Sequence, residues 1–449
     1  MQPDLTPPRK AVYALGDFTV NTALSSLSLI YAAYFLTQVA GLPGTLAGLV
    51  PLIGRLVDAV TDPAMGRLSD ITRLRAGRRR PYFLIGAIPF GISFALLWQD
   101  PGLGSLELRF AYYTLVYCML SVSMTILSVP YLALLPEMAR GYDDRTSLNA
   151  YRNVGSVFGI VAAVGIRPLA NALGGGSEGF ALAGVVLGVG LALPWLAVHR
   201  VSFERPAFRS RSDGVGFLEG LKLVVRHRTF MKLMGLYLCG RIAMDLVATL
   251  MILYFTFWLG RSEDFEPTMF LFLTSVVLSL LVWLRIARHF DKGTIFIFGC
   301  TWWMTSQLIF LFATPEWPRW VLFAYAPLSA FGYAAVDLMP WSMVGDVIDE
   351  DDVATGERRE GVYNGVFTFL RKLGGALGVF LVLATLDLFG LVQGEVQSEA
   401  VRRAVRFMTA LGPMLLLALA IWIARGYPLT RSAHGRILET LEARGRPRA

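Results

Sequence analysis

The chain has 449 residues, of which 55% are hydrophobic and 16% are charged, with a net charge of +8 and a mean hydropathy of +0.54. Soluble domains contain roughly 45–50% apolar and about 25% charged residues, so this chain has too little polar surface to enclose a water-soluble core. The composition therefore predicts a multi-pass membrane protein and excludes a large soluble domain.

Twelve apolar segments have the composition of membrane-spanning helices, which need about 20 residues each. Their expected bounds are 11–40, 43–66, 82–98, 108–135, 148–172, 178–198, 230–259, 267–287, 294–314, 319–345, 361–390 and 404–424. These runs are too long and too continuously apolar for barrel strands, which have about 10 alternating residues. The predicted fold class is therefore an all-α polytopic membrane protein.

Basic residues are concentrated in alternate loops. If the N-terminus is cytoplasmic, the cytoplasmic segments carry 28 of the 41 Lys and Arg residues and the opposite loops carry six. Both termini are therefore expected in the cytoplasm and the protein in the cell membrane, which is the inner membrane in a double-membrane bacterium. The basic loops lie beside anionic headgroups without interleaved aromatic residues, so the lipid bilayer, and no nucleic acid, is expected as a partner.

The longest polar interruption divides the spans into two sets of six. Each set has a basic connection between its second and third spans, at 67–81 and at 288–293, which indicates a weak internal repeat. Two such halves are typical of a large class of secondary transporters, whose substrate sites lie near the midplane. The expected domains are the N-terminal bundle 1–199, the cytoplasmic linker 200–229, the C-terminal bundle 230–425 and the cytoplasmic tail 426–449.

Ionisable residues inside the second span are candidate functional residues, because each costs roughly 2.5–3.5 kcal/mol to insert. Arg55, Asp58 and Asp62 share one helical face. Two ionised carboxylates one turn apart repel, so they need a cation, a shared proton or a basic neighbour. A monovalent cation with oxygen ligands meets this need, and the alternative is a structural ion pair of Arg55 with Asp58 or Asp62. Pro63 and Gly66 favour a local break in the helix that frees carbonyl oxygens for the cation.

Other polar residues within the spans indicate a substrate site. Asp17 and Asn21 in the first span share a face and suit substrate hydroxyls, although an interhelical hydrogen bond is an alternative role for Asn21. Arg152 in the fifth span and Lys372 in the eleventh are the expected positive partners. Lys372 follows Arg371, and adjacent helical residues point about 100° apart, so only one of the two is expected to face the cavity.

Charged residues also mark two loops expected on the cytoplasmic side. In GRLSDITRLRAGRRRPY, Asp70 can pair with the arginine run that contains Arg78 and Arg79, and such pairs form a gate that opens and closes. In PWSMVGDVIDEDDVATGERREG, Asp346 begins an acidic run that precedes Arg359. This second motif is either an ionic gate or a solvated cytoplasmic face.

Several motifs together resemble a known family. The sequence contains, in this order, LVDAVTDPAMGRLSD, GRRRPY, VPYLALLPEM, DDRTSLNAYRN, PWSMVGDVIDEDDVATGERREG and FTFLRKLGGALG. The combination resembles the glycoside-pentoside-hexuronide:cation symporters of the major facilitator superfamily, whose best-known members are the melibiose carriers. The resemblance extends from Tyr13 to about Gly378. It implies the major facilitator fold, with twelve transmembrane helices in two six-helix bundles.

The resemblance implies a cation site on the second and fourth spans. Asp58 and Asp62 match the carboxylates that bind the coupling cation, and Thr125 matches a neighbouring oxygen ligand. Thr61 stands where the melibiose carriers have Asn, which favours H+ without deciding between H+ and Na+. No cofactor beyond the coupling cation is expected, and no metal beyond Na+ at Asp58 and Asp62.

The resemblance also implies substrate-site residues on the first, fifth and eleventh spans. Arg152 matches a substrate-side Arg, and Lys372 matches a Lys near the cation site. Asn21 stands where the melibiose carriers have a sugar-binding Asp, and Asp17 is a rival for that role.

The fourth span departs from the melibiose carriers. Its motif VPYLALLPEM contributes Tyr131 to the expected substrate site. Ser128 stands where the melibiose carriers have Asp, and Leu132 where they have Trp. Melibiose itself is therefore not the expected substrate, whereas another glycoside, an acidic sugar or an amphiphile remains open.

These inferences predict a secondary active transporter that couples symport of a sugar, glycoside or uronide to Na+ or H+ by alternating access. The alternatives are a carrier of a lysolipid-like amphiphile and a proton-coupled exporter. An enzyme is not expected, because the sequence lacks HExxH, a phosphate-cradling GxxxxGK[ST] and a GxSxG in a suitable context. The expected partner is a small-molecule substrate, and the expected functional unit is a monomer.

Overall fold

The structure is a computed structural model that describes residues 5–74, 77–139, 142–204, 222, 224–356, 359–394 and 396–443. The chain divides into two compact units. Unit 1 comprises Met1–Arg211 and Leu383–Gln397, and unit 2 comprises Ser212–Val382 and Ser398–Ala449. Much of the predicted linker 200–229, the end of the tail and Arg358 lie outside the described residues.

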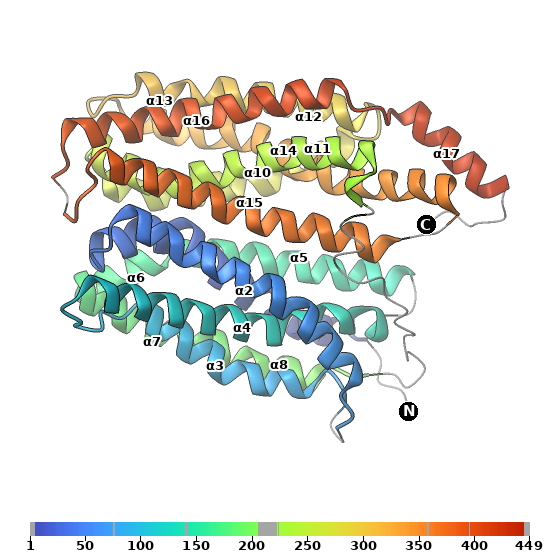
Figure 1. Cartoon of the computed structure of the whole chain (residues 1–449), viewed down its shortest axis with the longest axis horizontal. Coiled ribbons are helices and arrows are strands. Elements are labelled where there is room, and N and C mark those ends of the chain that lie inside the picture. Colours follow the sequence, from blue (N-terminus) through green and yellow to red (C-terminus); the bar gives the residue numbers. More distant parts are fainter. Residues whose placement is uncertain are drawn as a thin grey trace. The chain divides into compact units, whose positions relative to one another are not determined.

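Helices of unit 1 carry the first six predicted spans (Figure 1). They are α1 Pro7–Ser26 with its π-helical continuation Leu27–Val39, α2 Gly44–Ile71, α3 Pro81–Leu97, α4 Leu106–Met138, α5 Tyr142–Val164, α6 Ile166–Ala172, α7 Gly176–Ala192 and α8 Pro194–Val201. Helix α1 begins at Pro7, whose missing N–H and fixed φ suit the first helical position. The Ser105 side chain caps α4 by accepting a hydrogen bond from the backbone N–H of Leu108 at 3.3 Å.

Helices of unit 2 carry the last six predicted spans and one further helix in the tail. They are α10 Arg228–Leu253 with its π-helical continuation Tyr254–Trp258, the 3-10 turn Ser262–Asp264, α11 Phe265–Ile286, α12 Lys292–Gln307, α13 Ile309–Phe312, α14 Arg319–Thr355, α15 Glu360–Leu388, α16 Glu399–Arg425 and α17 Arg431–Ala443. Helix α15 reaches beyond the boundary of unit 2 at Val382. Helix α14 ends at Gly356, whose φ of +77° is the left-handed conformation that glycine adopts without strain.

Each of the twelve predicted spans coincides with one helix or with two consecutive helices. Ten stretches of the described residues are helical, long and apolar enough to cross a membrane. The fifth span is a pair of helices, Ser147–Val164 and Ile166–Ala172, bent by 42°. Helix α3 has 17 residues, fewer than the roughly 20 that a full span needs. The all-helical class is confirmed: among the described residues ten helices, or eleven with the bent pair, are long and apolar enough to cross a membrane, and α3 is a shorter apolar helix at the remaining predicted span.

Helices α2 and α14 are among those that extend beyond their predicted spans. Helix α2 continues to Ile71 and passes through Pro51 and Pro63, so the predicted break in this helix is wrong. Helix α14 continues to Thr355, well past the predicted end at 345. Its additional turns carry carboxylates that are buried beside basic side chains. These contacts stabilise helix where the sequence has the composition of a polar loop.

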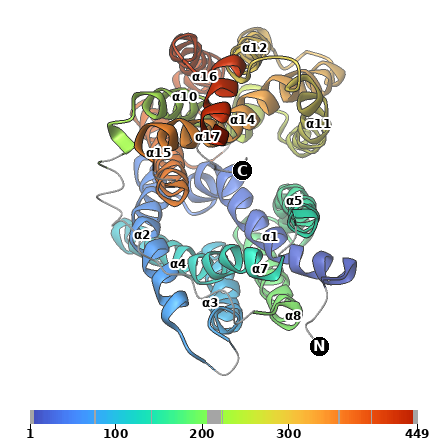
Figure 2. The ribbon, with the colours of Figure 1, turned by 90° about the vertical axis from the view of Figure 1, so that its right-hand side faces the viewer.

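Small residues bring α1 and α5 close together in unit 1 (Figure 2). Gly155 and Gly159 are four residues apart on the same face of α5, a spacing that lets membrane helices approach closely. A Cβ added at Gly155 would lie 2.4 Å from the backbone oxygen of Ala14, and one added at Gly159 would lie 2.4 Å from that of Phe18. The two helix backbones are therefore in direct contact, on either side of Asp17.

Replacing Gly159 with alanine is expected to destabilise the protein, because the new methyl group would collide with a backbone atom that cannot rotate away. Overpacking of this kind costs typically about 1–3 kcal/mol. The matched control is Gly190→Ala in α7, where an added Cβ meets nothing within 4 Å. Thermal unfolding in detergent should show a lower melting temperature for Gly159→Ala alone. Equal melting temperatures for the two variants would contradict this account of the α1–α5 contact.

Candidate functional site

The charged face of α2 carries an ion pair between Arg55 and Asp58 and is joined to α4 by a hydrogen bond. Arg55 Nη1 donates to Asp58 Oδ2 at 2.9 Å, and Asp58 is 4% exposed. The hydroxyl of Thr125 in α4 donates to Asp62 Oδ1 at 2.6 Å. Thr61 donates to the backbone oxygen of Val57 at 3.0 Å, so its hydrogen is used within α2. The structure thus brings Asp62 and Thr125 together, and it forms the Arg55–Asp58 pair that the sequence left as an alternative.

These contacts distinguish the two carboxylates of α2. The charge of Asp58 is balanced by a guanidinium at hydrogen-bond distance. Asp62 accepts a hydrogen bond from the Thr125 hydroxyl, whose oxygen has lone pairs that can turn toward a cation. Among the residues that the structure describes, no group of three or more His, Cys, Asp and Glu side chains is arranged to hold a metal ion. The chemistry of the Asp62–Thr125 pair suits a proton or an alkali cation with oxygen ligands.

A second charged group joins α1, α4 and α5. Arg152 binds Asp17 through two parallel bonds, Nε to Oδ2 at 2.6 Å and Nη2 to Oδ1 at 3.0 Å. The hydroxyl of Tyr131 donates to Asp17 Oδ2 at 2.6 Å, and the Arg152 guanidinium lies 5.2 Å from the centre of the Tyr131 ring. Both charged side chains are 14% exposed. The pair is therefore a partly buried, charge-assisted contact with an added cation–π interaction.

Tyr131 is held rigidly in this group. Its ring stacks on that of Tyr13 at a centroid distance of 4.3 Å, and the Tyr13 hydroxyl donates to the backbone oxygen of Tyr131 at 2.6 Å. A Cβ at Gly16 would lie 2.7 Å from the Tyr131 ring, so α1 leaves room for the ring at this position.

Asn21 donates to Ser156 Oγ at 3.1 Å. Asn21 thus forms the interhelical hydrogen bond that was its alternative role, and Asp17 is the residue that meets Arg152.

Ser128 and Lys372, the other two expected substrate residues, lie in different units. Ser128 is half-buried in α4 of unit 1, and Leu132, one turn further along, is 54% exposed. Lys372 is half-buried in α15 of unit 2, as is its neighbour Arg371. Arg371 interacts electrostatically with Asp337 of α14. Arg371 therefore contributes to a charge cluster inside unit 2.

That cluster in unit 2 was not predicted as a site. In α10, Arg241 binds Asp245 through Nη2 to Oδ1 at 2.5 Å and Nε to Oδ2 at 3.0 Å. Asp337 interacts electrostatically with Arg241, Arg371 and Asp245. The sequence signal for this cluster is the four-residue spacing of Arg241 and Asp245, which places them on one helical face.

The arginine turn after α2 forms ion pairs at the end of unit 1 predicted to face the cytoplasm. Arg79 Nη2 donates to Asp70 Oδ1 at 2.6 Å, so the predicted pairing of these two residues is present. Arg78 and Arg79 both bind Glu137 at the end of α4. Glu137 is 2% exposed. Glu137 lies in the motif VPYLALLPEM and was not predicted as a site residue, although an acidic residue at a span end, with an arginine run at the end of a neighbouring span, is a usable signal.

The acidic run of α14 pairs with basic residues that are distant in the sequence. Lys292 Nζ lies 2.7 Å from both oxygens of Asp346. Arg359 Nη1 lies 3.7 Å from Asp351 Oδ2, so Asp346 and Arg359 pair with different residues. The members of the run that are less than 9% exposed are Asp346, Asp349, Asp351 and Asp352. The solvated-face alternative is therefore wrong for these four.

The tail helix α17 docks beside this run. His434 Nε2 lies 3.0 Å from Asp349 Oδ2 and 3.6 Å from Asp346 Oδ1. The backbone N–H of Arg431 donates to Asp291 Oδ1 at 2.7 Å. Polar residues of the tail and of the α11–α12 connection enclose a cavity of about 200 Å³. The tail helix is thus part of unit 2.

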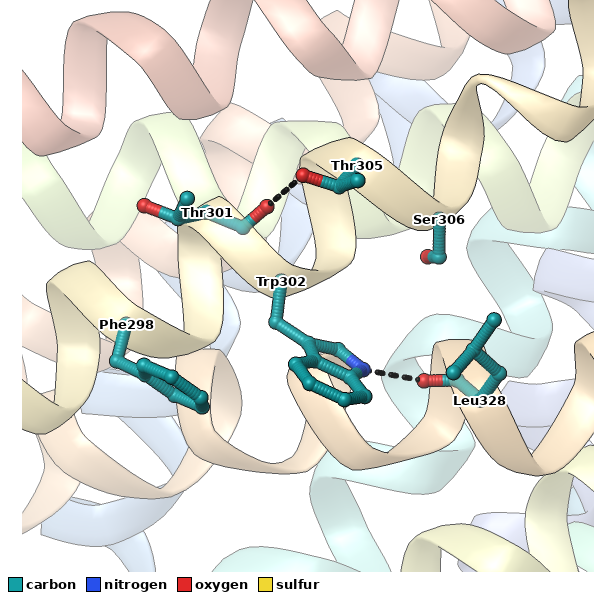
Figure 3. A pocket seen from close by; sticks show the side chains of 6 residues that line it. All are labelled: Phe298, Thr301, Trp302, Thr305, Ser306 and Leu328. Atoms are coloured by element: carbon teal, nitrogen blue, oxygen red, sulfur yellow. Dashed lines mark hydrogen bonds between the residues drawn. The ribbon is translucent and has the colours of Figure 1, made fainter.

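A cavity of about 290 Å³ lies elsewhere in unit 2, between α12 and α14 (Figure 3). It is lined by Phe298, Thr301, Trp302, Thr305, Ser306 and Leu328. Its polar groups are bonded within the protein, since Trp302 donates to Leu328 O at 2.8 Å and Thr305 to Thr301 O at 2.8 Å. None of the predicted site residues lines it, so it is not a candidate for the charged site.

Comparison with known proteins identifies relatives that match almost the whole chain. A family model described as MFS/sugar transport protein matches residues 12–431. An uncharacterized symporter of Synechocystis sp. is 30% identical, covering 97% of this chain and 96% of that protein. The sodium-dependent lysophosphatidylcholine symporter 1-A of Danio rerio is 25% identical, covering 95% and 86%. The crystal structure of the nucleoside transporter NupG matches with a TM-score of 0.69 at 13% identity, covering 94% and 99%. The predicted major facilitator fold is confirmed by these matches.

Proposed function

The chain belongs to the family of MFS/sugar transport proteins, and on this premise we propose that it is a symporter that couples Na+ or H+ to uptake of a sugar, glycoside or uronide. It works as a monomer in the cell membrane, with both termini in the cytoplasm and no cofactor beyond the coupling cation. The observation that carries this proposal is Asp62, an aspartate on a membrane-spanning helix that accepts a hydrogen bond from Thr125.

Coupling follows from the charges on α2. The formal charges of Arg55, Asp58 and Asp62 sum to one negative charge on α2 when both aspartates are ionised. An ionised group inside a span costs roughly 2.5–3.5 kcal/mol, so binding of Na+ or H+ at Asp62 lowers the cost of enclosing this face. The cation then favours the occluded carrier over the open one, which is how a ligand shifts a conformational equilibrium.

The polar group around Arg152 supports a hydroxylated or acidic substrate. Carboxylate and guanidinium groups together accept and donate hydrogen bonds, as the hydroxyls of a sugar require. A substrate carboxylate could replace Asp17 at the Arg152 guanidinium, and substrate hydroxyls could bond to either group, so the pair can serve a uronide or a neutral sugar.

Ligand-dependent thermal stability tests this proposal. A ligand that binds only the folded protein at 100 times its Kd raises the free energy of unfolding by about 2.7 kcal/mol. Purified protein would be heated with a galactoside, glucuronate or lysophosphatidylcholine, each with and without Na+ and at two pH values. A shift with glucuronate or the galactoside that grows with Na+ or acid supports the proposal.

Other outcomes of the same experiment would contradict the proposed symport of a sugar, glycoside or uronide. A shift with lysophosphatidylcholine alone would assign an amphiphile as the substrate, in line with the name of the Danio rerio relative. No shift with any sugar or uronide under any condition would contradict the symport of sugars and direct the work to efflux assays.

A further inference from the structure

Glu204 holds the arginine turn through its backbone. Its carboxylate accepts hydrogen bonds from three consecutive N–H groups, those of Arg78 at 2.8 Å, Arg79 at 2.8 Å and Arg80 at 3.0 Å. Successive N–H groups that converge on one anion form a nest, and bonds to an ionised acceptor are stronger than neutral ones. Glu204 lies three residues beyond the end of α8, so it joins the α2–α3 connection to the chain that leaves unit 1.

The turn is shaped to receive this carboxylate. Gly77 has a φ of +111°, and a Cβ added there would lie 2.5 Å from Glu204 Oε1. A second contact links the same two segments, because Arg80 Nη2 donates to the backbone oxygen of His199 at 2.9 Å. The His199 ring nitrogen Nδ1 lies 2.9 Å from the Arg80 backbone oxygen. The carboxylate of Glu204 therefore fits against the turn only because residue 77 has no side chain.

The anchored turn directs arginine side chains into the bundle. With its N–H bound to Glu204, Arg79 is 7% exposed and reaches Asp70 in α2 and Glu137 in α4. The Glu204 carboxylate joins the turn to the helix ends together with the Arg80–His199 contacts and the Arg79 ion pairs. Three helix ends, those of α2, α4 and α8, thus meet at one carboxylate-bound turn.

We propose that Glu204 is a positioning residue for transport. By binding the N–H groups of residues 78–80, it holds the Arg79 ion pairs in place. As a result, the start of the inter-unit segment moves with the ends of α2 and α4. The proposal rests on the transport function proposed above. It concerns the rate of the conformational step and not the binding of substrate or cation, because Glu204 lies outside the Asp62 and Arg152 groups.

Hydrogen exchange of the full-length protein tests the anchor without any substrate. Glu204→Gln keeps the size of the side chain but places an NH2 group opposite a backbone donor. We expect amide exchange at residues 78–80 to rise about tenfold or more, and the rise to extend to peptides that contain Asp70 and Glu137. Glu178→Gln, an exposed carboxylate in α7, is the matched control and should change neither. Unchanged exchange at 78–80, or a rise confined to those residues, would overturn the proposal.

Uptake into proteoliposomes tests the role in transport, with radiolabelled glucuronate as the probe. Glu204→Gln should lower the maximal rate about tenfold with a KM within about twofold of wild type, since the step and not the binding is affected. A wild-type rate, or a changed KM at an unchanged maximal rate, would overturn the proposal. If the wild-type protein does not transport glucuronate, the substrate assignment fails, while hydrogen exchange still decides the role of Glu204.

A second variant covers the case in which Glu204→Gln does not fold. Gly77→Ala leaves Glu204 in place but introduces a Cβ into its carboxylate and strains the turn. It should reproduce the increase in exchange and the loss of rate. The double variant should be no worse than either single one, because both disrupt the same contact. Additive effects of the two substitutions would overturn the proposal.

Discussion

Asp62→Asn is expected to abolish cation-driven accumulation of substrate while leaving the protein folded and able to bind substrate. Asparagine keeps the shape of the side chain and can still accept the hydrogen bond from Thr125. It can neither carry the negative charge that attracts Na+ nor bind a proton at physiological pH. The coupling step therefore loses its driving force, whereas the Arg152 group is untouched.

Two measurements separate the loss of coupling from a loss of folding. Accumulation in proteoliposomes under a Na+ or pH gradient should fall to background, and the stabilisation by Na+ or acid should disappear. The stabilisation by the substrate should persist in part. Full cation-driven accumulation by Asp62→Asn would refute the assignment of this carboxylate.

The other carboxylate of α2 provides the control. Asp58 is paired with Arg55 and buried, so Asp58→Asn removes the charge that this carboxylate supplies to the guanidinium. Breaking a buried ion pair from one side costs about 3–5 kcal/mol, so this variant should lose thermal stability as well as transport. Asp62→Asn should melt close to the wild-type temperature. A large loss of stability in both variants would mean that the two carboxylates share a structural role.

The helical architecture was predictable because long apolar segments have one stable form in a bilayer. The predicted ends of the helices were wrong where contacts with side chains outside the segment determine how far the helix continues. Helix α14 reaches Thr355 because Asp346 and its neighbours are buried beside Lys292 and His434. No local pattern relates residues so far apart in the chain.

The charged residues show the same limit. The helical spacing left the pairing of Arg55 with Asp58 or Asp62 as an alternative to a cation site, and the resemblance implied that Thr125 lies near Asp62. Contacts through backbone groups gave no such signal. Glu204 is one acidic residue within a polar segment, which is not a distinctive pattern. Its role depends on a turn that begins at Gly77, more than a hundred residues earlier.

Breaking the Asp17–Arg152 pair is the second substitution with a large expected effect. Both side chains are 14% exposed, and each is the charged hydrogen-bond partner of the other. Arg152→Gln or Asp17→Asn alone leaves one charge largely buried, with a cost that approaches the roughly 3–5 kcal/mol of a fully buried pair. Each single variant should therefore melt at a clearly lower temperature, and neither should transport substrate.

The double variant distinguishes the two effects. Asp17→Asn with Arg152→Gln removes both charges, so its stability should recover toward wild type, as a double-mutant cycle would reveal. Transport should not recover, because the carboxylate and the guanidinium that the substrate is proposed to contact are both absent. Recovery of transport together with stability would show that the pair serves only to hold α1 against α5.

Arg152→Lys tests the geometry of the contact and not its charge. Lysine keeps the positive charge but cannot form two parallel bonds to Asp17 or stack its cation as a plane over Tyr131. If the planar group is what the substrate and Asp17 both require, uptake should fall at least about tenfold while the folded protein survives. Wild-type uptake in this variant would reduce the role of Arg152 to its charge, because a point charge at the same place would then do all that the guanidinium does.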